Sequence, residues 1–190
     1  MSVLRNLEIK DAPFMLEWMH DENVNKGFQI DFASKTMEDC VSFIKNSQSD
    51  AENIHYAVVD SDDEYMGTVS LKEIDSKSRS AEFAIAMRTK AHGTGLAAKA
   101  MEEIIELGLY EKGLRSVYWN VLQSNVRAIR FYDKNSFLRS LPHTHTHTYI
   151  YGGRFFGTRP HAKTLREGRL SKKRKEHWES IPYSICELSA

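Results

Sequence analysis

The sequence lacks several features that mark membrane, secreted and metal-binding proteins. Its 190 residues include only two cysteines, Cys40 and Cys186, which are far apart and not at the spacing of metal ligands. No apolar run is long enough to span a bilayer, and the N-terminus lacks the apolar core of a secretory signal. We therefore expect a soluble protein of the reducing cytoplasm with no membrane partner.

Net charge is also lacking, because 26 basic side chains balance 26 acidic ones. The balance is uneven along the chain: residues 1–150 carry 17 Lys or Arg against 22 Asp or Glu, and residues 151–190 carry 9 against 4. A basic run, Lys172–Lys175, lies in this second part. It is typical of nucleic-acid binding or of a solvated turn. We favour the turn and expect no nucleic-acid partner.

Alternation of apolar and polar residues predicts a mixed α/β fold. The predicted strands are 3–7, 54–60, 65–74, 81–88 and 116–122, and the predicted helices begin at Asp11, near Ser34, at Leu96 and at Asn125. The short turn at 61–64 suits an antiparallel hairpin. This order of elements predicts a mostly antiparallel central sheet with helices on both faces.

Two glycines stand where the fourth predicted strand gives way to a helix, in the stretch Lys90-Ala-His-Gly93-Thr-Gly95. The first amides of a helix have no partner within it and attract anions, although a plain tight turn would also require glycine. A dinucleotide-binding loop would need an acidic residue about 20 positions on, and residues 114–132 contain neither Asp nor Glu. A nucleoside-triphosphate loop would need Gly-Lys-Ser/Thr, which is missing.

A second motif, Asn125-Val-Arg-Ala128-Ile-Arg-Phe-Tyr132, follows the fifth predicted strand. Together with the glycine loop and the order of elements, it resembles the GNAT superfamily of acetyl-CoA-dependent acyltransferases, whose loop reads Arg/Gln-x-x-Gly-x-Gly/Ala. Lysine stands in the leading position here, and Ser136 stands where the family has glycine. The resemblance covers about residues 3–137. It implies the GNAT fold in a single acetyltransferase domain over 1–190, acetyl-CoA as co-substrate, and no metal.

The resemblance also implies where acetyl-CoA binds, in a cleft between the fourth and fifth strands. The pyrophosphate would meet main-chain amides of the glycine loop, and the pantetheine arm would pair with the backbone of Ile85 to Arg88. The expected cofactor-binding residues are Ile85, Met87, Arg88, Lys90, His92, Gly93, Thr94, Gly95, Leu96, Ala97, Asn125 and Ala128.

Acyl transfer to an amine needs a proton for the leaving thiolate, a donor for the oxyanion and a base. The resemblance gives Tyr132 the role of general acid, the alternative being a half-buried core tyrosine. The main-chain amide of Met87 is the candidate oxyanion donor. Glu82 is the candidate base, and a cross-strand salt bridge with Lys or Arg is the alternative. No cysteine is placed for a covalent intermediate, so direct transfer is expected.

The acceptor is left open by the sequence. The opening segment and a Glu-Gly-x-Leu ending resemble subgroups that acetylate amino sugars or the N-terminal amines of ribosomal proteins. We favour the primary amine of a small molecule or amino sugar over a protein amine. A catalytically inactive CoA-binding or regulatory module is the alternative of a different class.

Residues 138–165 are interpreted as an unusual insertion, because 166–170 and 181–188 resemble the last two strands of the family. The insertion contains the run His143-Thr-His-Thr-His-Thr148 and an aromatic cluster that includes Tyr149 and Tyr151. No acid or cysteine near the histidines completes a metal shell, so a threonine-rich hairpin is expected there. The cluster is expected to cover the acceptor site or to form a homodimer contact.

Overall fold

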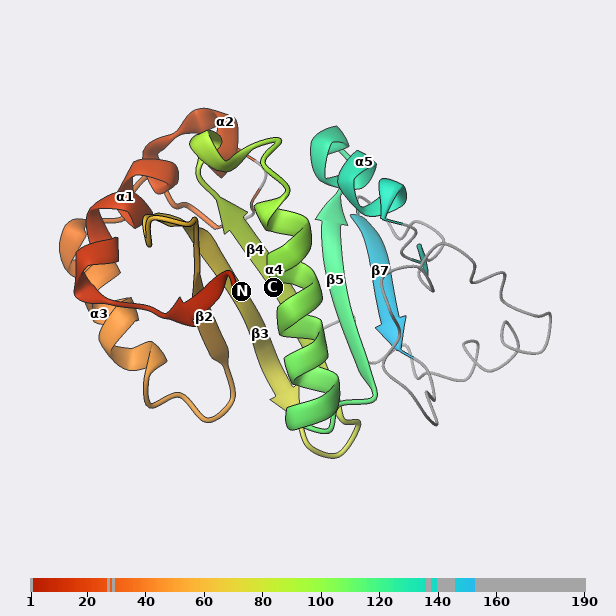
Figure 1. Cartoon of the computed structure of the whole chain (residues 1–190). Coiled ribbons are helices and arrows are strands. Elements are labelled where there is room, and N and C mark those ends of the chain that lie inside the picture. The colour runs from red at the N-terminus through yellow and green to blue at the C-terminus, as the bar shows by residue number, and fades with distance from the viewer. Residues whose placement is uncertain (1, 27, 29, 136–137, 140–145, 153–190) are drawn as a thin grey trace, which may run out of the picture. The chain divides into compact units, whose positions relative to one another are not determined.

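The computed structural model describes residues 2–26, 28, 30–135, 138–139 and 146–152, and in this part of the chain seven strands form one sheet (Figure 1). The strands are β1 (Leu4–Asn6), β2 (Ile54–Val59), β3 (Tyr65–Asp75), β4 (Ser80–Met87), β5 (Ser116–Leu122), β6 (Leu138–Arg139) and β7 (Thr146–Gly152). Their order is β1-β2-β3-β4-β5-β7-β6. Every neighbouring pair is antiparallel except β4 and β5, which are parallel.

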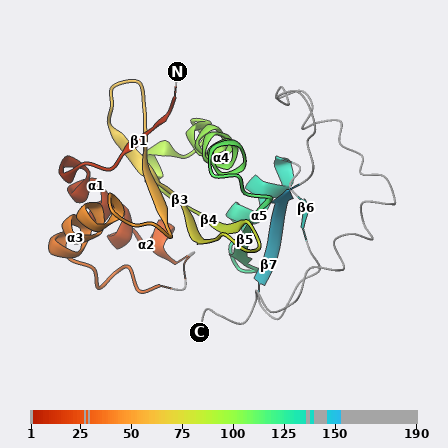
Figure 2. The same cartoon turned by 90° about the horizontal axis from the view of Figure 1, so that it is seen from below.

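Helices cover both faces of this sheet, as predicted. They are α1 (Ala12–His20), α2 (Glu22–Asn25), α3 (Met37–Ser47), α4 (Leu96–Glu106) and α5 (Val126–Lys134), with the short turns η1 (Ile9–Asp11), η2 (Thr89–Ala91) and η3 (Leu107–Glu111). Figure 2 shows α4 on one side of the sheet and α1 and α3 on the other. None of these helices is both long and apolar enough to cross a bilayer.

Each face has its own apolar core. On one face Met101 and Ile104 of α4 pack with Phe83 of β4. On the other face Trp18 of α1 and Ile44 of α3 pack against Ala86 of β4. Residues 83 and 86 project to opposite faces because side chains alternate along a strand. The strand β4 therefore lies between both cores.

The ends of the helices follow from local capping. The helix α3 begins after Thr36, whose hydroxyl accepts the Asp39 amide at 3.3 Å while the Asp39 carboxylate accepts the Thr36 amide at 2.9 Å. This start lies three residues beyond the predicted start near Ser34. The prediction missed α2, a single turn with no buried residue, because it has no apolar stripe to reveal it.

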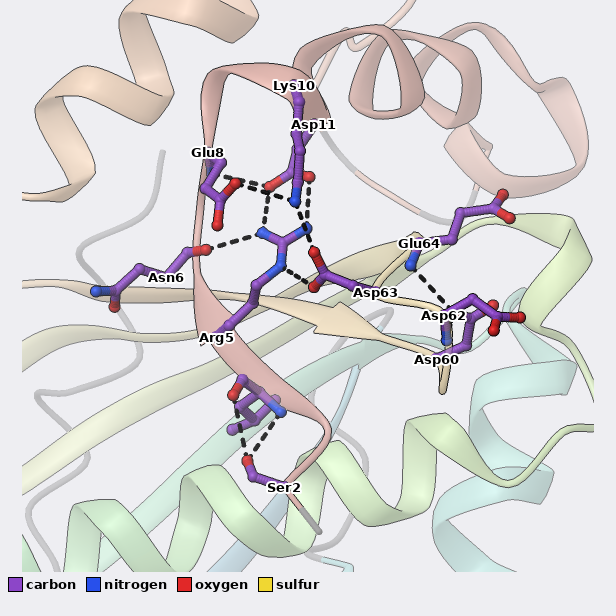
Figure 3. Close-up of polar contacts among 11 residues, drawn as sticks. Ser2, Arg5, Asn6, Glu8, Lys10, Asp11, Asp60, Asp62, Asp63 and Glu64 are labelled. Carbon is purple, nitrogen blue, oxygen red and sulfur yellow. Dashed lines mark hydrogen bonds and ion pairs between the residues drawn. The ribbon is translucent and has the colours of Figure 1, made fainter.

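A charged cluster fixes the N-terminal segment to the hairpin between β2 and β3 (Figure 3). The Arg5 guanidinium donates to both carboxylate oxygens of the buried Asp11 at 2.8 Å and, through Nε, to Asp63 at 2.6 Å. Lys10 donates to the other oxygen of Asp63 at 2.6 Å. Asp63 has a left-handed backbone, with φ of 61°. The planar fork of arginine suits this two-sided carboxylate arrangement.

Part of the segment interpreted as an insertion forms strands in the structure. Residues 146–152 form β7, which pairs with β5 from Ser116↔Gly152 to Leu122↔Thr146, and β6 pairs with β7 at Leu138↔Ile150. These residues therefore belong to the sheet. His143, His145 and residues 153–190 lie outside the described residues, so the assignment of 166–188 as strands and the single domain over 1–190 stay predictions.

The aromatic cluster expected on this segment is partly internal. Tyr149 of β7 is fully buried. Its ring stacks on Trp119 of β5, with 5.7 Å between centroids and 4° between planes, and its hydroxyl donates to Asp133 at 2.9 Å. A stacked pair of this kind fixes β7 against β5.

We predict that Tyr149→Ala lowers the free energy of unfolding by about 3–5 kcal/mol, the usual cost of removing a large buried ring. Tyr110→Ala serves as the matched control, because Tyr110 is 55 % exposed, and should change stability by less than about 0.5 kcal/mol. Urea unfolding followed by circular dichroism measures both. Equal stabilities of the two variants would contradict the burial of Tyr149 between β5 and α5.

Candidate active site

The strands β4 and β5 pair over three positions only, from Ser80↔Ser116 to Glu82↔Tyr118. Both strands continue beyond this point, β4 to Met87 and β5 to Leu122, and they diverge toward their C-terminal ends (Figure 1). The divergence was predicted from the family resemblance. Among the described residues, no strand pairs with the second half of β4 on the β5 side.

The direction of the peptide groups at the end of β4 follows from its ladder with β3. The Arg88 amide donates to the Met66 carbonyl at 2.8 Å, and Met87 lies opposite Gly67. Because hydrogen-bonded and non-hydrogen-bonded pairs alternate in an antiparallel ladder, the peptide groups of Ile85 and Met87 point away from β3, toward β5. The expected pairing of these backbone groups with a pantetheine arm stays a prediction.

Gly67 is a feature of this region that the sequence did not reveal. A Cβ at position 67 would lie 2.3 Å from the Ala86 carbonyl oxygen and 2.6 Å from the Met87 sulfur. Glycine therefore lets the end of β4 approach β3 more closely than any other residue would allow. Glycine in a strand interior is the signal for such an approach, but it does not say which strand approaches.

The glycine loop has the geometry of an anion site. Gly93 and Gly95 have φ of +82° and +86°, and Gly95 is the N-cap of α4. A Cβ at either position would meet no atom within 4 Å. The left-handed backbone, rather than crowding by the protein, therefore requires glycine here.

Some of the loop amides are already engaged. The His92 amide donates to the Thr89 carbonyl at 3.0 Å. The Thr94 hydroxyl donates to Ala91 at 2.8 Å and accepts the Leu96 amide at 3.3 Å. The amides of Gly93, Gly95 and Ala97 have no acceptor among the described residues. We expected the main-chain amides from His92 to Ala97 to bind the pyrophosphate, and these three amides are fewer than that. They lie at the N-terminal end of α4, which is the positive end of its dipole.

The side chain of His92 lies at the junction of the loop, β4 and α5. Burial lowers the pKa of His92 most strongly, and the positive charge of Arg127 lowers it further, against the opposing effects of Asp21 and of a hydrogen bond with the Met87 backbone. The imidazole is therefore mainly neutral at pH 7. Arg127, in the first turn of α5, brings a cation close to the loop, and the sequence did not single it out.

Tyr132 of α5 lies in an aromatic cluster. It is 6 % exposed, and its ring centroid lies 5.2 Å from that of Trp119 and 5.1 Å from that of Tyr149. Burial, with a smaller effect of Tyr149, raises the pKa of Tyr132 well above its usual range. The phenol therefore keeps its proton at neutral pH, as a general acid must.

In the structure Asn125 and Ala128 form a hydrogen bond at the start of α5. The Asn125 side chain accepts the Ala128 amide at 3.1 Å and so caps the N-terminus of α5. This bond accounts for the spacing of the two residues in the second motif. Their predicted contact with the cofactor stays a prediction.

Three charged residues predicted for the site are bound to protein partners. Glu82 forms a salt bridge with Lys72 at 2.9 Å, where β4 still pairs with β5. The structure therefore places it away from the glycine loop, in the ion pair that was the alternative to a catalytic base. Lys90 pairs with Glu64 at 2.6 Å, and the Arg88 side chain turns away from the loop into a charged network with Glu64.

No group of three or more His, Cys, Asp or Glu side chains in the described ranges is arranged to hold a metal ion. Cys40 is buried, and burial raises the pKa of its thiol.

Comparisons with known proteins agree with this layout. Residues 2–137 match the family model of the acetyltransferase (GNAT) domain. An uncharacterized N-acetyltransferase, p20, of Bacillus licheniformis is 23% identical over 137 residues, which cover 70% of this chain and 77% of that protein.

Two solved structures of the Vibrio cholerae spermidine N-acetyltransferase are similar in fold. The complex with CoA and spermine has a TM-score of 0.67 at 20% identity and covers 77% of this chain and 91% of the other. A dodecameric structure in an intermediate state has a TM-score of 0.63 at 20% identity, over 78% and 92% of the two chains.

We predict that Gly95→Val abolishes the rise in melting temperature that acetyl-CoA produces, because the side chain occupies the space beside the loop amides and strains a left-handed backbone. Strain of this kind costs about 1–3 kcal/mol. Gly113→Val is the matched control, since Gly113 also has positive φ, at 66°, but lies beyond η3. It should lose stability and keep the acetyl-CoA shift. If Gly95→Val keeps the shift, the loop is only a turn.

Proposed function

We propose, because the chain belongs to the GNAT family of acetyltransferases, that it transfers the acetyl group of acetyl-CoA to the primary amine of a small molecule. The family model covers well over half of the chain. As a member of this family the protein is an acyltransferase that uses acetyl-CoA. The acceptor and the roles of individual residues are the proposal.

One observation carries the proposal: loop amides that have no acceptor in the described part of the chain lie at the same end of the sheet as the β5-facing peptide groups of β4. Gly93, Gly95 and Ala97 suit the pyrophosphate of CoA, and Ile85 and Met87 suit the amides of its pantetheine arm. Arg127 supplies positive charge nearby, whereas the charge of Lys90 is balanced by Glu64.

The chemistry follows from these positions. The neutral amine attacks the thioester carbonyl, and the Met87 amide donates to the oxygen as it becomes negative. The carbon–sulfur bond then breaks, and Tyr132 gives its proton to the CoA thiolate. The amine loses a proton to solvent, and Tyr132 regains one from solvent, so the enzyme returns to its starting state. We do not assign the base to Glu82, because its carboxylate is held by Lys72.

The acceptor is best sought among small amines. The enzyme of the two similar solved structures is a spermidine N-acetyltransferase, so polyamines lead the panel, followed by amino sugars and a peptide with a free N-terminus. Incubation with acetyl-CoA, with release of free CoA thiol and the mass of the acetylated product as readouts, tests the proposal. Acetylation of the peptide alone would make the protein-amine alternative correct, and binding of acetyl-CoA without any product would indicate an inactive module.

We propose that the protein self-associates, either as the homodimer expected from the sequence or as a larger assembly, since a similar enzyme forms a dodecamer. Sedimentation velocity of the purified protein measures its state. A monomer at micromolar concentration would contradict this part of the proposal.

We predict that Tyr132→Phe lowers kcat by about 10²–10⁴-fold, the usual contribution of a general acid, and leaves KM for acetyl-CoA nearly unchanged. The ring is kept, so its packing on Trp119 is kept. Tyr149→Phe is the control, because it removes a hydroxyl from the same aromatic cluster without removing the proposed acid. Steady-state kinetics with the best amine gives both values. Equal kcat for the two variants would show that the thiolate takes its proton from water.

A further inference from the structure

The Arg88 side chain is unusually well bound for a residue at the end of a strand. It is 7 % exposed. Nε and Nη2 donate to the two carboxylate oxygens of Glu17 at 3.0 and 2.8 Å, and Nη1 donates to Glu64 at 2.7 Å and to the Tyr65 carbonyl at 2.9 Å. Its guanidinium carbon lies 4.6 Å from the centre of the Phe14 ring, within the range of a cation–π contact.

These contacts connect three elements that are distant in the sequence. Glu17 and Phe14 belong to α1, Glu64 and Tyr65 lie at the start of β3, and Arg88 directly follows β4. Burial alone would lower the pKa of Arg88, but the bonds to Glu17 and Glu64 outweigh it and raise the pKa. The cation is thus held at a fixed place by two anions, a carbonyl and a ring.

Arg88 stands between the two parts of the proposed cofactor site. Its own amide is bonded to Met66, and the residue before it is Met87, the proposed oxyanion donor. The next residues form η2, which leads into the glycine loop, and Lys90 of η2 binds the second oxygen of Glu64 at 2.6 Å. The contacts of the Arg88 guanidinium and of Lys90 therefore hold the chain on both sides of the Met87–Arg88 peptide, between the oxyanion donor and the entry to the loop.

We propose that Arg88 is a positioning residue for acetyl-CoA: its fork clamps the end of β4 to α1 and β3, and so fixes the direction of the Met87 amide and the start of the glycine loop. This inference rests on the proposed function. Arg88 was expected to contact the cofactor through its backbone, and the new role belongs to its side chain. Glu17 shares the role from α1, because it binds two of the guanidinium nitrogens.

The test is Arg88→Lys, which keeps the charge but loses the planar fork. We expect kcat/KM for acetyl-CoA to fall at least tenfold, with both a higher KM and a lower kcat. Arg5→Lys is the matched control, because Arg5 also binds two carboxylates and a backbone carbonyl, but in the cluster at the N-terminal segment. It should lower the melting temperature and leave kcat/KM within twofold of wild type.

Glu17→Gln keeps the inference testable if Arg88→Lys does not fold. The Glu17 side chain is half exposed, so the fold should tolerate the change, and KM for acetyl-CoA should rise severalfold. Kinetics are measured at a temperature where every variant is folded by circular dichroism. Unchanged kcat/KM in Glu17→Gln and in folded Arg88→Lys would overturn the positioning role. Failure of the wild type to bind acetyl-CoA in a calorimetric titration would instead overturn the proposed function.

Discussion

The separation of β4 from β5 after Glu82↔Tyr118 is the constraint on which the rest of the site depends. A regular parallel ladder would have used the peptide groups of Ile85 and Met87, and the glycine loop would then face a closed sheet. The strand β5 tolerates the loss of hydrogen bonds to β4 because β7 pairs with it over seven positions on its other side. The sheet is therefore continuous where β4 and β5 begin, up to Glu82↔Tyr118. Beyond that point the backbone of β4 can hydrogen-bond to a ligand.

The turn between β2 and β3 holds the diverging strand in place. Two adjacent acidic residues in this region bind two separate clusters: Asp63 binds Arg5 and Lys10, and Glu64 binds Arg88 and Lys90. The N-terminal segment and the end of β4 thus share one anchor. A buried or partly buried charge that has lost its partner is far more costly than an exposed one, so this arrangement strongly restricts where β4 can end.

The strands and long helices could be predicted because their apolar periodicity is strong. The strand at 116–122 is found with the predicted bounds, and the glycines of the loop were recognised from their place before a helix. Residues whose role depends on partners far along the chain could not be predicted. Nothing local shows that Arg88 meets Glu17 or that Tyr149 stacks on Trp119. The salt bridge of Glu82 was one of two alternatives, and the sequence did not decide between them. Register and topology decide such contacts, and one sequence carries little information on either.

Residue-resolved amide hydrogen exchange by NMR, with and without saturating CoA, tests the central claim most directly. We predict that bound CoA slows exchange at Gly93, Gly95 and Ala97 of the loop and at Ile85 and Met87 of β4, because the ligand offers acceptors that these amides lack among the described residues. Amides in the middle of α4, such as that of Ile104, should change little by comparison. Saturated binding with unchanged exchange at the loop and at the end of β4 would contradict the account.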